Sequence, residues 1–174
     1  MPPVALVDPS TIDCSHPLID LEGIRQGNPQ RFEMEQLTGI VLCDAAKHLI
    51  IGYKDISPDE FWVRGHLPGF PIMPGVLMCE AAAQLASYFC HVIGIVKDGF
   101  LGFGGMEDVR FRGPVRIGDR LVLVVKTGKV HRRQTIFDAQ GFVDNNMVFH
   151  AKIIGVPIAM PSSDIKAAAN AEAL

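Results

Sequence analysis

The apolar segment that runs from Ile72 to Val96 predicts a single long helix. After Gly75, its polar side chains recur at spacings of four, three and four residues: Glu80, Gln84, Ser87 and His91. Those spacings place them on one face of a helix and leave every other face apolar. Gly94 stands in a stop position. The pattern therefore predicts a helix from about Gly75 to Ile93 that is wrapped on nearly all sides.

Around this helix the pattern is that of short strands. A short helix is predicted at Asp20–Gln26, and the turn residues at 144–146 predict a hairpin between the last two strands. The predicted strands are Gly39–Cys43, His48–Ile56, Phe61–Val63, Phe103–Phe111, Arg120–Lys129, Gln134–Val143 and Met147–Val156. The sequence thus predicts the α+β class, with five to seven antiparallel strands curled around one buried helix. This domain spans 19–160, after an N-terminal arm at 1–18 and before a flexible tail at 161–174.

Composition narrows the class of protein. A chain of 174 residues with 48% apolar and 20% charged residues fits one globular domain. The four cysteines form no CxxC pair, and the N-terminus has no secretory pattern, so we expect reduced thiols and a cytoplasmic location. Ile72–Val96 is long enough to span a membrane. However, Glu80 at mid-span would cost about 2.5–3.5 kcal/mol, which favours a buried core helix.

The net charge of −3 names no partner, but its distribution is uneven. Between Arg110 and Arg133 lie eight of the sixteen Lys and Arg residues against one acid, Asp119. This stretch is either a set of outward-facing charges on strands or a landing surface for an acidic partner. Nucleic-acid binding is disfavoured by the negative overall charge and the few aromatics in the basic stretch. Gly99–Gly105 is glycine-rich but starts no βαβ unit, so it is no dinucleotide loop.

The candidate chemistry lies where the helix begins. His66 precedes a loop rich in proline and glycine, and Pro74 suits a first helical position. The free amides of Gly75 and Val76 would then polarise a carbonyl oxygen, as removal of a proton next to a thioester requires. A histidine on the loop is suited to take that proton, and a carboxylic acid on the next turns to donate one. Alternatively, His66 is a surface residue and the glutamate pairs with an arginine.

Two blocks of sequence resemble the hot-dog-fold 3-hydroxyacyl-[acyl-carrier-protein] dehydratases of the FabZ type. The first is Gly65-His-Leu-Pro-Gly-Phe-Pro-Ile-Met-Pro-Gly-Val-Leu-Met-Cys-Glu-Ala-Ala-Ala-Gln84, and the second runs from Phe103 to Asp119. The resemblance implies that a curled sheet wraps the helix and that two protomers join their sheets edge to edge. The active site would lie at the subunit interface of this homodimer or of a higher even-numbered homo-oligomer.

The resemblance also implies roles for residues and partners. His66 would be the base and Glu80 the acid. A glutamate rather than an aspartate at position 80 favours the FabZ type over the FabA type. The amides of Gly75 and Val76 would hold the thioester carbonyl. Gln84 would orient the carboxyl group, and the backbone at Ile72 would orient the imidazole. No metal or organic cofactor is implied. Acyl carrier protein would be the partner of the basic residues Arg110, Arg112, Arg116, Arg132 and Arg133.

The chain departs from the family's pattern at Leu67 and in Glu33–Thr38, where polar side chains replace apolar ones. Two other functions compete with a dehydratase. A thioesterase on the same scaffold would use the helix-borne acid but not the His-x-Pro-Gly loop. A non-catalytic module would bind acyl chains or a carrier protein without turnover.

Overall fold

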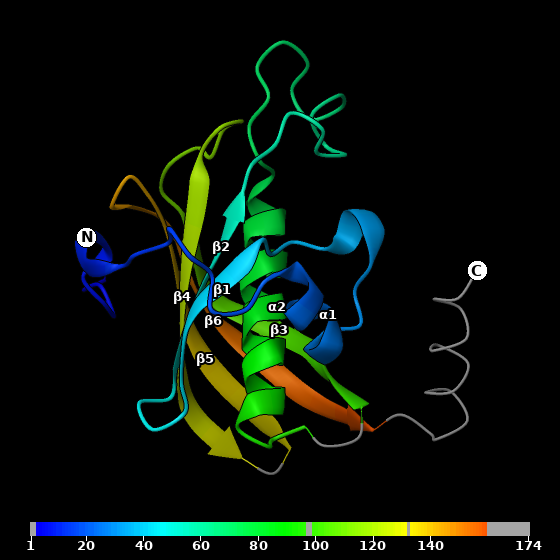
Figure 1. Cartoon of the computed structure of the whole chain (residues 1–174), viewed down its shortest axis with the longest axis vertical. Coiled ribbons are helices and arrows are strands. Elements are labelled where there is room, and N and C mark those ends of the chain that lie inside the picture. Colours follow the sequence, from blue (N-terminus) through cyan, green and yellow to red (C-terminus); the bar gives the residue numbers. More distant parts are fainter. Residues whose placement is uncertain (1–2, 97–98, 132, 160–174) are drawn as a thin grey trace.

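The computed structural model describes residues 3–96, 99–131 and 133–159. One six-stranded antiparallel sheet, in the order β1-β2-β4-β5-β6-β3, packs along one side of a long helix, α2 (Figure 1). The strands are β1 (Gly39–Asp44), β2 (Leu49–Asp55), β3 (Gly99–Phe111), β4 (Arg120–His131), β5 (Gln134–Val143) and β6 (Asn146–Ala159). The helices are α1 (Leu21–Gly27) and α2 (Gly75–Val92), with 3₁₀ turns at Pro9–Thr11 and Phe32–Met34. This arrangement confirms the predicted α+β class.

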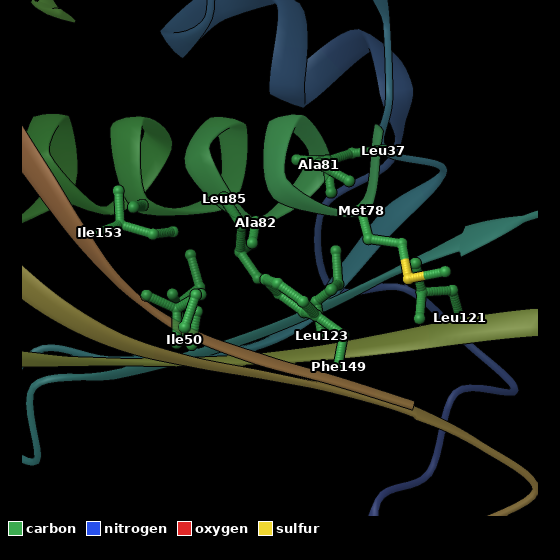
Figure 2. Close-up of a cluster of buried hydrophobic side chains, with 14 of the residues drawn as sticks. Leu37, Ile50, Met78, Ala81, Ala82, Leu85, Leu121, Leu123, Phe149 and Ile153 are labelled. Atoms are coloured by element: carbon green, nitrogen blue, oxygen red, sulfur yellow. The ribbon is translucent and has the colours of Figure 1, made fainter. Parts of the chain in front are cut away.

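Helix α2 fills the concave face of the sheet, as its apolar pattern predicts. Met78, Ala82 and Leu85 point from the helix toward the side chains of the sheet (Figure 2). The sheet contributes a set of fully buried side chains to the same cluster: Ile50, Leu121, Leu123, Phe149 and Ile153. Small residues on α2 allow close approach, which is why the contact is dense. No helix among the described residues has the length and apolar character needed to cross a membrane.

The N-terminal arm covers part of the opposite, outer face of the sheet. The side chain of Gln140 on β5 binds the arm at two points: its Oε1 accepts from the amide of Leu6 at 2.8 Å, and its Nε2 donates to the carbonyl of Val4 at 2.9 Å. The arm then packs on a second apolar cluster centred on Ile51, Val124 and Phe142. The predicted tail at 161–174 lies outside the described residues.

The hairpin predicted at 144–146 is present, with Asp144 and Asn145 both at positive φ, as a two-residue turn requires. The strand predicted at Phe61–Val63 is wrong, because these residues lie in successive turns. Trp62 is buried there, and its carbonyl accepts from the amides of Gly65 and His66. Its hydrophobicity therefore serves to anchor a turn rather than to build a strand.

The long strand β3 forms one edge of the sheet. On its other side it pairs with β6, with irregularities in the register after Phe103 and after Glu107. Two large aromatic side chains on this edge strand are exposed, Phe103 by 59% and Phe111 by 48%. Long edge strands that carry exposed apolar groups are normally covered in folded proteins. In the single chain, this edge is therefore an exposed apolar surface.

We expect Leu85→Ala to lower the free energy of unfolding by about 2–5 kcal/mol, since Leu85 is fully buried between α2 and the sheet. Urea unfolding at one fixed protein concentration measures this loss. The matched control is Leu18→Ala at an exposed position, which should change stability by no more than about 0.5 kcal/mol. Equal losses in both variants would contradict the packing described above.

Candidate active site

His66 lies on the loop before α2, and the backbone fixes its ring. Its Nδ1 is 2.8 Å from the carbonyl oxygen of Ile72. A carbonyl can only accept, so a neutral ring must carry its proton on Nδ1 and its lone pair on Nε2. The imidazole is half-buried, and a nitrogen that carries a lone pair is chemically able to accept a proton. The carbonyl of Ile72 therefore contacts the ring, and its part in orienting a catalytic base stays a prediction.

The turn after β3 supports the loop that carries His66. Ile72 forms an isolated β-bridge with Arg116, and the amide of Met73 donates to the carbonyl of Val115 at 2.7 Å. The guanidinium of Arg116 lies 5.5 Å from the ring centroid of Phe70, a cation–π contact. These contacts hold the loop next to the N-terminus of α2.

The N-terminus of α2 presents amides that have no acceptor within the helix. Gly75 and Val76 occupy its first two positions, and the first amides of any helix lack intrahelical partners. Pro74 was predicted at the first helical position, but it has ψ of 130° and caps the helix from one residue earlier. Its extended ψ turns the chain into the helix from the loop. Val76 is 70% exposed, so this end is open to a ligand.

Gly75 is required by the close approach of Phe111. A Cβ atom at position 75 would stand 2.9 Å from three carbon atoms of the Phe111 ring. The ring of Phe111 also stacks on Phe149, with centroids 5.9 Å apart. The end of β3 therefore lies directly against the first turn of α2.

Glu80 is held by Gln84 one turn later. The Nε2 of Gln84 donates to Glu80 Oε1 at 2.7 Å and to the carbonyl of Met34 at 2.6 Å. The Oε1 of Gln84 accepts from the amide of Gln36 at 2.9 Å. Because one backbone group donates and the other accepts, the orientation of the Gln84 amide is fixed. Oε2 is then the oxygen of Glu80 that is not bound to Gln84.

Glu80 faces a cavity of about 190 Å³ between α2 and the edge of the sheet. The cavity is lined by Pro29, Gln30, Glu80, Ala83, Gln84, Ser87, Phe100, Leu101, Gly102, Phe103, Ile153, Ile154 and Gly155. Its walls are mainly apolar, with polar atoms gathered near the helix, as in sites for acyl chains and other small ligands. His66 is not among the lining residues. Within one protomer, the two candidate groups thus have separate surroundings.

The predicted basic surface is not continuous. Arg110 stands opposite His150 near one end of the sheet, whereas Arg133 lies in the turn between β4 and β5. His150 in turn pairs with Gln140, and Arg133 lies seven residues before Gln140, about 23 Å away along the direction of β5. Arg112 lies beside Arg110, Arg116 contacts the loop of His66, and Arg132 lies outside the described residues.

Sequence reasoning missed the loop that holds Gln84. Asn28 is buried and donates from Nδ2 to the carbonyl of Gln84 at 2.9 Å. Glu35 binds the guanidinium of Arg25 through two hydrogen bonds of 2.6 and 2.9 Å, which lower the pKa of the Glu35 carboxyl. The sequence did carry a signal for this loop, namely the polar residues within Glu33–Thr38 that depart from the family's pattern. Glu35 and Gln36, two of these residues, make the hydrogen bonds that build the loop.

Comparison with known proteins identifies the family. The model of the FabA-like domain matches residues 28–152. The 3-hydroxyacyl-[acyl-carrier-protein] dehydratase FabZ of Desulfotalea psychrophila is 34% identical over 139 residues, 78% of this chain and 91% of the relative. FabZ of Campylobacter jejuni (strain 81-176) is 34% identical over 143 residues, 78% of this chain and 95% of the relative. The chain belongs to the FabZ-type dehydratase family. The solved dehydratase heterocomplex ApeI:P from Xenorhabdus doucetiae, at 12% identity and a TM-score of 0.65 over 84% of this chain and 97% of that one, shares the hot-dog fold of this FabZ relative.

We expect Gly75→Ala to destabilise the protein by about 1–3 kcal/mol, because the added methyl group collides with Phe111. Thermal or urea unfolding measures the change. Gly65→Ala is the matched control, since a Cβ there meets nothing within 4 Å. The double variant Gly75→Ala with Phe111→Leu should recover part of the loss, and no recovery would contradict the contact.

Proposed function

We propose that this protein removes water from (3R)-3-hydroxyacyl groups on acyl carrier protein and yields the trans-2-enoyl thioester. The observation that carries the proposal is the pair of oriented groups: the imidazole of His66 and the carboxyl group of Glu80, whose Nε2 and Oε2 have no hydrogen-bond partner among the described residues. The loop of His66 leads into the first turn of α2, whose amides suit a thioester oxygen. Family membership gives the class of reaction, a hydro-lyase reaction, and the geometry supports the role that we propose for each group.

The proposed mechanism moves two protons and one hydroxyl group. The Nε2 of His66 takes the proton from C2, and the amide of Gly75 stabilises the negative charge that develops on the thioester oxygen. Electrons of the broken C2–H bond form the C2=C3 double bond. The C3–O bond breaks as Glu80 donates a proton from Oε2 to the hydroxyl group, which leaves as water. The imidazolium then returns a proton to the carboxylate, directly or through water.

We propose that the base and the acid come from different protomers of a homodimer. In a two-fold dimer formed by antiparallel pairing of β3 with its own copy, the Phe111 end of one strand lies beside the Phe103 end of the other. Gly75 packs under Phe111, and Phe103 lines the cavity of Glu80. Such pairing brings the His66 loop of one protomer to the Glu80 cavity of its partner. It also covers both exposed aromatic side chains of the edge.

For the carrier protein we propose docking at the turn between β4 and β5, where Arg133 lies. Thr135 pairs with Gly155, and Gly155 pairs with Phe103. Gly155 and Phe103 both line the cavity of Glu80. Arg133 is two residues before Thr135, so it lies near the part of the sheet that borders this cavity. A positive charge there suits an acidic carrier protein.

A cytoplasmic location is part of the proposal. The four cysteines, Cys14, Cys43, Cys79 and Cys90, are free thiols in the structure. Burial raises the pKa of Cys79 to about 11 and that of Cys90 to about 12, so both are unreactive core groups. Free, protonated thiols suit a reducing compartment.

We expect His66→Ala and Glu80→Gln each to lower kcat/KM by a factor on the order of 10²–10⁴, as loss of a general base or acid does. The assay follows the absorbance of the enoyl thioester formed from a 3-hydroxyacyl carrier substrate. His16→Ala and Glu22→Gln, at exposed positions, are the controls. Free thiol released without enoyl product would indicate a thioesterase instead. Wild-type binding of the carrier without any turnover would indicate a non-catalytic module.

The two inactive variants also test the shared site. A mixture of His66→Ala and Glu80→Gln protomers, exchanged to equilibrium, should regain about one quarter of wild-type activity, since half of the dimers are mixed and each has one intact site. A site contained within one protomer predicts no recovery. Size-exclusion chromatography with light scattering checks that exchange has occurred.

We expect Arg133→Glu to raise KM for the carrier-bound substrate about tenfold and to leave the pantetheine thioester of the same acyl group unaffected. Reversal of the charge repels an acidic carrier but does not touch the reacting groups. The matched control, Arg64→Glu, lies on the loop before α2. If Arg133→Glu slows both substrates alike, the carrier does not dock at this turn.

A further inference from the structure

A groove separate from the cavity of Glu80 lies on the outer face of the sheet, next to the first residues of the N-terminal arm. Its volume is about 470 Å³, within the range of small-ligand sites. Side chains of β3, β5 and β6 line it together with Pro3, Val4 and Leu6 of the arm. His150 and Lys152 line it, while their neighbours Phe149 and Ile153 belong to the core cluster around α2. The thickness of the sheet thus separates this groove from the cavity of Glu80.

Two arginines and one histidine gather in this groove. Arg110 on β3 stands directly opposite His150 on β6, and Nε of Arg112 donates to Nδ1 of His150 at 3.1 Å. An Nδ1 that accepts from a guanidinium carries no proton, so the neutral ring has its proton on Nε2. All three side chains therefore offer only donors to the groove. Burial, and then the charges of Arg112 and Arg110, lower the pKa of His150.

The positive charges of this cluster are not balanced. Lys152 is neutralised by Asp138, whose carboxylate is 2.6 Å from Nζ. Among the described residues, no carboxylate lies within ion-pair distance of Arg110 or Arg112. The one further acid in the lining, Asp108, opposes the effect of the arginines on His150 only weakly, and together with Glu107 it adds negative charge near Lys152. Like charges placed side by side on a sheet are unfavourable unless an anion joins them.

We propose that this groove binds the phosphate group of a small organic phosphate monoester. The guanidinium groups of Arg110 and Arg112 and the Nε2–H of His150 would contact the phosphate oxygens, a donor set suited to that group. The groove is larger than a phosphate ion, and the N-terminal arm gives it an apolar wall of Pro3, Val4 and Leu6. The organic part of the ligand lies against that wall. This site is distinct from the one proposed for dehydration, and its occupation does not depend on that activity.

The test follows the ring resonances of His150 by NMR as pH is varied. The full chain is studied in chloride, inorganic phosphate, phenyl phosphate or acetate at one ionic strength. Without a ligand, His150 should titrate below its ordinary pKa. Phenyl phosphate should raise that pKa, since the bound anion offsets the two guanidinium charges, and should bind more tightly than inorganic phosphate. Acetate should cause a much smaller change.

Arg112→Gln and Arg110→Gln should each weaken phenyl phosphate binding at least about tenfold, as loss of a charge-assisted hydrogen bond does. Arg64→Gln removes the same charge from the loop before α2 and should leave binding within about twofold of the wild type. The proposal is overturned if His150 responds equally to acetate and phosphate, or if Arg64→Gln weakens binding as much as Arg112→Gln. Equal affinity for phosphate and phenyl phosphate would exclude the role given to the apolar wall. Because the readout is His150 itself, failure here is separable from failure of the dehydratase proposal.

Discussion

The hydrogen bonds of one buried amide hold the proposed acid, the helix and the preceding loop together. Gln84 is only 2% exposed, yet its side chain has a partner for each polar atom: the amide of Gln36, the carbonyl of Met34 and the carboxyl group of Glu80. A buried polar group without a partner costs about 1–3 kcal/mol, so these bonds depend on one another. A shift of the loop would release the amide and, with it, the fixed oxygen of Glu80.

The loop's departures from the family's pattern make sense in this light. A charged side chain at Glu35 would be costly near the helix if it stood alone. Arg25, ten residues earlier on α1, binds its carboxylate through two hydrogen bonds. The amide of Gln36 donates to Gln84, and Nε2 of Gln36 donates to the carbonyl of Glu33. The substitutions therefore compensate one another and leave the position of Glu80 intact, which favours retained rather than lost activity.

How well the sequence predicted each part depends on how local its cause is. Helix α2 and the turn at Asp144 and Asn145 follow from periodicity and turn chemistry within a few residues, and both predictions are correct. The strand predicted at Phe61–Val63 was wrong because the burial of Trp62 comes from tertiary packing of a turn. The contact between Gln36 and Gln84 spans 48 residues, so no window of sequence shows it. The basic residues between Arg110 and Arg133 do not form one continuous surface, because antiparallel strands carry neighbours in sequence to opposite ends of a sheet.

The proposed base and the proposed acid lie apart in one chain, and the edge strand β3 exposes apolar side chains. The proposed dimer accounts for both features. His66 is fixed by the carbonyl of Ile72 at the start of α2, while Glu80 points into a cavity beside β3. A single protomer that kept both groups ready would still leave Phe103 and Phe111 in water. In the proposed dimer, pairing of two β3 strands would cover these side chains and join the loop of one protomer to the cavity of the other. The contact proposed to stabilise the edge would then also complete the site, and an isolated protomer would not be active under that proposal.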